Sequence, residues 1–226
     1  MSPRPSAHDP RAIHRQLLAP HFPSDELMLE DCFVSAVADG TLNLHVEPAG
    51  DPDGEPLAVV VAEFHEPSRV LLVDYLAVSA AARGGGIGGR ALNTALAKWQ
   101  EQFAPRLVLA EVEHPTTRAR HAAHGDPAAR VAFYHRLGAK ALPVPYAQPP
   151  LHPAGNSVEG LMLVVLREDG RAPDHDVAAE PVRLFLADHL AGHPLQRASL
   201  AALPHGRVEM LPLDLPADQL PNPPSA

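Results

Sequence analysis

The sequence predicts an α/β (α+β) sandwich, in which helices pack on a mixed β-sheet. Apolar residues recur at helical spacing in the first forty positions and then alternate with a period of two from Thr41. Three short apolar stretches separated by Pro- and Gly-containing turns follow, which is typical of consecutive strands. Helical and strand patterns alternate after them up to Leu166, which favours helices layered on the sheet.

The N-terminal part is expected to be helical. Residues 9–18 carry Ile13 and Leu17 at helical spacing, and Ser24 is expected to cap a second helix that runs to about Ala38. Cys32, the chain's one cysteine, falls in an apolar stretch of that helix. We therefore expect a buried, inert thiol.

The following elements are assigned from periodicity and from their breakers. The segment 70–78 is almost wholly apolar and is predicted to be a central strand, and Gly138 is expected to end a helix. Strands are expected at 41–46, 57–64, 70–78, 106–112 and 158–166, and helices at 86–103 and 127–137. The Pro-, Gly- and Asp-rich segment 48–56 is predicted to connect a hairpin.

We divide the chain into three parts. Residues 1–40 form an N-terminal helical segment, 41–167 the core, and 168–226 a C-terminal extension. Two short helices are expected in the extension, at 182–190 and 195–203, for packing or a homodimer contact. The proline-rich segment 204–226 is predicted to be irregular, with about the last ten residues disordered.

Composition excludes several classes of function. The net charge of −9 argues against nucleic acid as a partner and is compatible with a cationic acceptor such as an amine. A single cysteine excludes an intrachain disulfide and a multi-cysteine zinc site, and the scattered histidines predict no metal site. Without an apolar run of ~18 residues or a signal-peptide pattern, we expect a cytoplasmic protein without membrane contact.

A glycine-rich segment, Arg83 to Gly89, lies between the central strand and the next helix. Its glycines are Gly84, Gly85, Gly86, Gly88 and Gly89. Each glycine in a helix costs ~1 kcal/mol relative to alanine, so the presence of five glycines here requires an explanation. Close approach of backbone N–H groups to an anion, most simply a phosphate, supplies one.

Two nucleotide-binding families share such glycines. A P-loop requires Lys and Ser/Thr where this chain has Arg90 and Ala91, so we reject it. The dinucleotide pattern is met by Gly84-x-Gly86-x-x-Gly89, with Glu111 as the downstream acid. Against it stand the five residues between strand and first glycine, and the three strands joined by short turns that come before.

A third family fits better. The segment resembles the acetyl-CoA motif of the GNAT superfamily of N-acyltransferases, Arg/Gln-x-x-Gly-x-Gly/Ala, which Arg83, Gly86 and Gly88 satisfy. The preceding strand ends in Leu76-x-Val78, also as in that superfamily. A second signature is similar as well: Phe133-Tyr134 followed after three residues by Gly138-Ala139. The resemblance covers roughly residues 42–166.

The resemblance implies a fold, a reaction and a set of roles. The fold would be a mixed, mostly antiparallel sheet flanked by helices, and the enzyme an N-acetyltransferase that moves an acyl group from acetyl-CoA to a primary amine by direct attack. It implies Tyr134 as the acid that protonates the departing thiolate. The residues implied to hold the cofactor are Leu76, Ala77 and Val78 along the pantetheine, and Arg83, Gly84, Gly85, Gly86, Ile87, Gly88 and Gly89 at the pyrophosphate.

The base that removes the amine's proton stays open. Glu111 and Glu113 have the same-face spacing of a strand and are expected to raise each other's pKa, Asp74 is a third candidate, and water alone a fourth. Arg118, Arg120 and Arg130 are candidates for cofactor phosphates. Where the superfamily often has an asparagine, this chain has Gly125-Asp126-Pro127.

The acceptor also stays open. It would be an amine on a small molecule or a peptide, and the proline-rich stretch 145–150 could wall its site. A non-catalytic acyl-CoA-binding module of the same fold and a dinucleotide-binding protein are the alternative functions.

Overall fold

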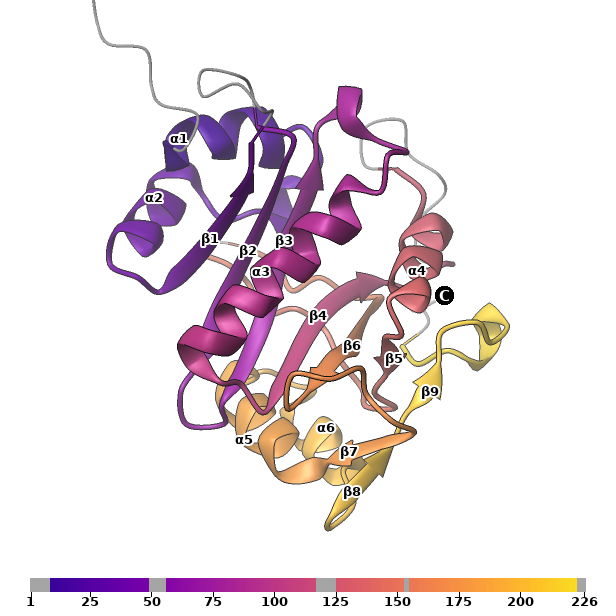
Figure 1. Cartoon of the computed structure of the whole chain (residues 1–226). Helices are drawn as coiled ribbons and strands as arrows, with labels where there is room; N and C mark the ends of the chain where they lie inside the picture. The colour runs from indigo at the N-terminus through magenta and orange to yellow at the C-terminus, as the bar shows by residue number, and fades with distance from the viewer. Residues whose placement is uncertain (1–8, 49–55, 117–124, 153–154, 223–226) are drawn as a thin grey trace, which may run out of the picture.

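A seven-stranded sheet runs through the centre of the computed structural model, which describes residues 9–48, 56–116, 125–152 and 155–222 (Figure 1). Its strand order is β1-β2-β3-β4-β6-β5-β9, and β7 and β8 form a separate two-stranded ribbon. The strands are β1 (Leu42–Glu47), β2 (Ala58–His65), β3 (Val70–Val78), β4 (Leu107–Glu113), β5 (Lys140–Ala141), β6 (Leu161–Glu168), β7 (Asp176–Ala178), β8 (Arg207–Glu209) and β9 (Leu211–Pro212). The helices are α1 (Pro10–Ile13), α2 (Glu30–Ala38), α3 (Ile87–Phe103), α4 (Pro127–Arg136), α5 (Ala179–His189) and α6 (Gln196–Ala202).

The topology confirms the mixed, mostly antiparallel sheet. β1, β2 and β3 form an antiparallel meander, β3 and β4 pair in parallel, and β4, β6, β5 and β9 pair antiparallel. The glycine-rich segment therefore follows a meander and not a βαβ unit. The dinucleotide fold considered from the glycine spacing is wrong for this reason.

Helices cover both faces of the sheet. Alternate residues of β2 belong to different clusters: Val60 packs with α3 and α4, whereas Val61 packs with the N-terminal helices. In β4, Val108 faces the first of these clusters and Leu109 faces α5 and α6. Figure 1 shows α3 crossing one face, with α1 and α2 beside the indigo edge and α5 and α6 at the opposite end of the other face.

The second N-terminal helix begins later than predicted. Ser24 starts a 3₁₀ turn (Ser24–Glu26) with no capping role, and Leu27 is extended, so the α-helix begins at Glu30. Leu27 is buried in the N-terminal cluster and the backbone N–H of Met28 donates to the Tyr75 hydroxyl. This tertiary anchoring interrupts the helix. Cys32 is exposed and not buried as expected, because the adjacent Phe33 takes the inward position.

The described residues 204–222 do not form the irregular tail that the prolines predicted. β8 pairs with β7, and β9 adds to the central sheet beside β5. Leu213 and Leu220 are buried in the same cluster as α4. Residues 223–226, where disorder was also expected, lie outside the described residues, as do 49–55 of the predicted hairpin connection. The two helices expected before the tail are present as α5 and α6.

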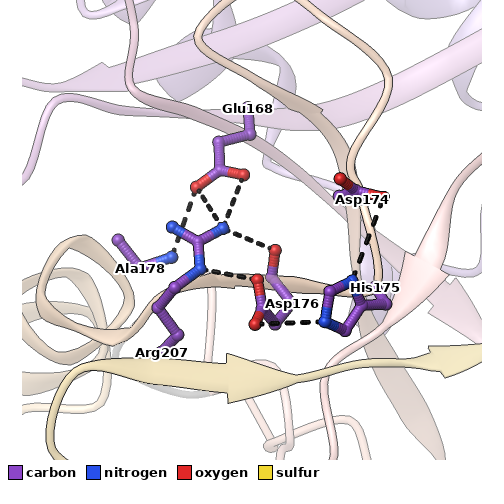
Figure 2. Close-up of polar contacts among 6 residues, drawn as sticks. All are labelled: Glu168, Asp174, His175, Asp176, Ala178 and Arg207. Atoms are coloured by element: carbon purple, nitrogen blue, oxygen red, sulfur yellow. Dashed lines mark hydrogen bonds and ion pairs between the residues drawn. The ribbon is translucent and has the colours of Figure 1, made fainter.

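Arg207 ties the β7–β8 ribbon to the end of the central sheet. Its guanidinium donates to the carboxylate of Glu168, at the end of β6, and to the side chain and carbonyl of Asp176 in β7 (Figure 2). Glu168 also accepts the N–H of Ala178, directly before α5. The network therefore fixes where α5 starts.

The parallel pair β3–β4 separates part-way along its length. The last paired residues are Val73 and Ala110, although β3 continues to Val78 and β4 to Glu113. On the other side of β3, Tyr75 pairs with Val61 and Val73 with Ala62, so Asp74 is the extra residue of a β-bulge. The sheet is thus split beyond Val73, with Asp74 at the start of the split.

Among the helices of the described residues, none combines the length and the apolar character that crossing a membrane requires.

Candidate active site

A cavity of about 470 Å³ lies at the split between β3 and β4. The N-terminal segment, the separated strands, the glycine-rich segment and α4 with the turn before it line most of the cavity, and Gln148 and the start of β6 complete it. The lining residues are His21, Phe22, Pro23, Glu26, Val73, Asp74, Leu76, Ala77, Val78, Arg83, Gly84, Gly88, Glu111, Glu113, Gly125, Asp126, Ala129, Arg130, Phe133, Tyr134, Gln148 and Leu161.

The structure brings most of the predicted site residues to this one cavity. Each candidate acid and base lines it: Tyr134, Glu111, Glu113 and Asp74. So do six of the ten predicted cofactor-binding residues, namely Leu76, Ala77, Val78, Arg83, Gly84 and Gly88. Gly85, Gly86, Ile87 and Gly89 lie outside the lining, and Ile87 instead packs against the core.

Glu111 is held by two hydrogen bonds. Its Oε1 accepts from the hydroxyl of Tyr146, and its Oε2 accepts from Nε2 of Gln148 at 2.9 Å. The side chain is only 6% exposed. Burial raises its pKa to about 7 and the charge of Glu26 adds to the rise, while the bonds from Tyr146 and Gln148 oppose it. A carboxylate with a pKa near 7 is suited to accept a proton at neutral pH.

Tyr146 is itself held by α5. Nε2 of His189 lies 2.8 Å from the Tyr146 hydroxyl, and the two rings are stacked. His189 also stacks on Phe185, with ring centroids 4.7 Å apart. Burial lowers the pKa of His189 to about 4, with a further contribution from His65, so the imidazole is neutral at pH 7. The neutral ring keeps the tyrosine in place without adding charge beside Glu111.

No sequence pattern singled out Tyr146, Gln148 or His189 as partners of Glu111. The stretch 145–150 was expected at most to wall the acceptor site, and Gln148 does line the cavity. His189 comes from the C-terminal extension. No spacing rule connects either segment to β4.

Glu113 differs from Glu111 despite the shared strand face. Both line the cavity, but Glu113 forms an ion pair with Arg130 of α4. The expectation that Glu113 raises the pKa of Glu111 is wrong, because burial and Glu26 raise it. Arg130, a candidate for a phosphate contact, thus neutralises the carboxylate of Glu113. Arg118 and Arg120, the other two candidates, lie outside the described residues.

Asp74 presents a carboxyl group at the bulge. Its Oδ2 is buried and has no hydrogen-bond partner among the described residues. Burial raises its pKa well above the usual range, and the charges of Glu111 and Glu63 add to the rise. The bulge therefore places a second acidic group beside Glu111.

Tyr134 lies on α4 and is 7% exposed. Its ring meets that of Phe133 edge-on, with centroids 5.1 Å apart. Burial raises its pKa to about 12, against the opposing charge of Arg130. The phenol therefore keeps its proton across the physiological range and faces the same cavity as the carboxylates.

The glycine-rich segment leads into the N-terminus of α3. Gly86 is the N-cap, with φ of 71°, and no side chain caps the helix. A left-handed N-cap of this kind favours glycine. A Cβ on Gly88 would lie 3.1 Å from Cγ2 of Val78, so a larger residue there would press on β3. Because no side chain caps α3, the N–H groups of its first turn are left for an external hydrogen-bond acceptor.

The family of the chain follows from a match that spans both signatures. The model of the acetyltransferase (GNAT) family matches residues 16–139, which include the glycine-rich segment and Tyr134. The chain belongs to the GNAT acetyltransferase family. It is therefore an acyltransferase, and its glycine-rich segment, β3 and α4 stand where the GNAT signatures were expected.

Solved structures of GNAT proteins share the fold. A putative GNAT acetyltransferase from Bacteroides thetaiotaomicron superposes with a TM-score of 0.57 at 20% identity, over 81% of this chain and 90% of that chain. The NatC complex bound to Gag peptide and CoA gives a TM-score of 0.48 at 16% identity, over 70% and 91%. The similarity to the Bacteroides protein supports the fold alone, and the similarity to the NatC complex supports no further conclusion. No curated protein matches the chain.

GNAT enzymes take their acyl group from acetyl-CoA, and two features beside the cavity are compatible with such a donor. The uncapped N-terminus of α3 offers N–H groups to a pyrophosphate. β3 beyond Val73 has an edge that β4 does not pair, which can receive an extended pantetheine arm as an added strand. Among the described residues, no three His, Cys, Asp or Glu side chains are grouped to hold a metal ion.

Proposed function

We propose that the chain catalyses the N-acetylation of a primary amine with acetyl-CoA, by direct attack of the amine on the thioester when both substrates are bound. One observation carries the proposal. Glu111, with a pKa of about 7, and the protonated Tyr134 line the same cavity, at the split beside the glycine-rich segment. A base and an acid therefore face one space in which donor and amine would meet.

Glu111 is the proposed base. An alkylammonium has a pKa of ~10.4, so the nitrogen needs a proton acceptor before it can attack. Glu111 accepts this proton, and Tyr146 and Gln148 orient the carboxylate through both oxygens. Glu113 is a weaker candidate because its charge is committed to Arg130.

Tyr134 is the proposed acid. As the nitrogen forms its bond to the acetyl carbon, the carbon–sulfur bond breaks and its electron pair moves to the sulfur. The Tyr134 hydroxyl donates its proton there. After the attack the nitrogen still carries two protons, and the loss of one of them gives the neutral amide. Burial disfavours the phenolate, so this proton restores Tyr134, and the proton held by Glu111 is released to solvent.

The backbone of the glycine-rich segment and the edge of β3 are proposed to hold the donor. The N–H groups at the start of α3 bind the pyrophosphate and Arg83 adds positive charge beside it. Arg83 lies between the carbonyl of Val78, 3.4 Å from its Nε, and the ring of His21, 3.2 Å from its Nη2. Leu76, Ala77 and Val78 pair through their backbone with the pantetheine arm.

Ligand binding and product formation test the proposal together. Thermal shift with CoA, acetyl-CoA, NAD and NADP should show stabilisation by the two CoA forms. Thiol release from acetyl-CoA should then depend on an added amine. Stabilisation by NAD and not by CoA would refute the donor assignment, and CoA binding without thiol release over a broad amine panel would favour a non-catalytic module.

A further inference from the structure

Gln148 has an unused hydrogen-bond acceptor beside the proposed base. The residue is 7% exposed and lines the cavity. Its Nε2 donates to Glu111, which fixes the orientation of the amide because a carboxylate accepts only. Its Oε1 is buried and has no hydrogen-bond partner within the described part of the chain. Such an oxygen lowers its energy only when an N–H or O–H donor reaches it.

Asp74 adds a second unused acceptor on the opposite strand of the split. Its Oδ2 is likewise buried without a partner among the described residues. Asp74 and Glu111 directly follow the last paired residues, Val73 and Ala110, so the two carboxyl groups flank the opening. A buried carboxylate is costly unless a cation compensates it.

Neither arginine of the described lining pairs with Asp74 or Glu111. Two arginines belong to the described lining, and each has another contact: Arg130 pairs with Glu113, and Arg83 lies against Val78 and His21. The part of the cavity around Asp74, Glu111 and Gln148 therefore offers oxygen atoms that accept hydrogen bonds, together with negative charge. The complementary ligand donates hydrogen bonds and is positively charged, whereas an acidic substituent would be repelled.

We infer that the acceptor is an aliphatic amine with a second cationic group and no acidic group, as in a diamine or polyamine. Glu111 takes the proton of the reacting amine, which then is neutral. Asp74 pairs with the second ammonium group, whose charge persists through the reaction, and Oε1 of Gln148 accepts an ammonium N–H. The net charge of −9 favours the approach of such a polycation. This inference rests on the proposed acetyltransferase function.

Three acceptors of matched length test it. Acetylation by the full chain is followed by thiol release with 1,4-diaminobutane, butylamine and 4-aminobutanoate. We expect kcat/KM to fall at least about tenfold from the diamine to the monoamine and again to the amino acid, since one retained charge pair is lost and then a repulsion is added. A monoamine or amino acid used as well as the diamine would overturn the inference.

Asp74→Asn tests the role of the second carboxylate. The ratio of kcat/KM for 1,4-diaminobutane over butylamine should fall towards one. Glu63→Gln is the matched control, because it removes a nearby negative charge that contributes to the field at Asp74 from outside the lining; this ratio should stay within about twofold. An equal fall for both amines in Asp74→Asn would make Asp74 a general requirement of the site and refute the cation pairing.

Binding without turnover separates the two levels of the proposal. With CoA at saturation, thermal shift should show stabilisation by 1,4-diaminobutane and none by 4-aminobutanoate. If CoA binds and the amino acid is the better ligand or substrate, the inference fails and the acetyltransferase function stands. If neither CoA binding nor amine-dependent thiol release occurs, the function itself fails.

Discussion

The hydroxyl of Tyr146 donates a hydrogen bond to the carboxylate of Glu111, and the bond joins a proline-rich loop to the strand that carries the proposed base. Nε2 of His189 lies within hydrogen-bond distance of the same hydroxyl. Through these three residues the C-terminal extension contacts the proposed base, because α5 supplies the histidine.

Glu111→Gln should remove the acidic limb of the pH–rate profile. With a pKa of about 7, Glu111 is protonated below this pH, so kcat/KM of the wild type should rise through pH 7. The amide cannot accept the proton, and the rate should fall by roughly 10²–10⁴. Glu113→Gln and Asp74→Asn are measured beside it. If one of them alone lost the limb, the base would be that residue.

The same substitution should change the pH dependence of stability. Because burial raises the pKa of Glu111 from 4.5 to about 7, the folded protein binds more protons than the unfolded chain between these values. The free energy of unfolding therefore falls as pH rises through this window, by roughly 3 kcal/mol. Urea unfolding should show Glu111→Gln to gain stability relative to wild type from pH 5 to pH 8. Glu101→Gln, on the exposed side of α3, should show no such gain.

Tyr146→Phe should shift the acidic limb to higher pH. The lost hydrogen bond lowers the pKa of Glu111 in the wild type, so that pKa should rise, by about one to two units for a bond to a charged group. The pH profile of kcat/KM measures the shift. Tyr75→Phe is the control: its hydroxyl contacts Met28, and an equal shift there would show that any buried hydroxyl has this effect.

Tyr134→Phe should lower kcat and leave KM for acetyl-CoA within about twofold. The ring and its packing against Phe133 remain, and only the proton donor for the sulfur is lost, which is worth roughly 10²-fold in rate. Steady-state kinetics with saturating amine measure both constants. Unchanged turnover would assign the proton to water.

Gly88→Val should weaken acetyl-CoA binding by roughly tenfold, about 1.4 kcal/mol. A Cβ at this position already lies 3.1 Å from Val78, and Gly88 lines the cavity. Gly85→Ala is the matched change in the same segment, since its Cβ would have 3.9 Å to its nearest neighbours. Titration calorimetry with CoA compares the two. Equal losses would point to the conformation of the segment and not to crowding at β3.

The features that sequence predicted best are those set by local pattern. The meander, the glycine-rich segment and α4 follow from short-range periodicity and from glycine and proline, and the order of these elements determines most of the sheet. A binding site between the glycine-rich segment and α4 could be predicted, because both GNAT signatures lie in these two elements and residues of both line the cavity. The hydrogen bonds to Glu111 could not, since they join β4 to Tyr146 and Gln148 across a connection with no periodicity.

The errors have a common cause in tertiary packing. β9 contains Pro212, although the prolines of this segment predict irregular structure. An edge strand tolerates proline because its outer side needs no N–H donor. The burial of Leu27 interrupts the helix predicted from Ser24. Strands of two or three residues, such as β5, are also too short for a period to be recognised.

The pairing of Ala141 with Leu211 has a consequence for biosynthesis. β5 is made long before its outer neighbour, so a nascent chain presents an unpaired strand edge until β9 leaves the ribosome. Such an edge invites pairing with other chains. Once β9 has docked, Pro212 lies at the sheet's border, where it offers no N–H to an incoming strand. A segment synthesised well after β5 thus protects the edge of the finished sheet against aggregation.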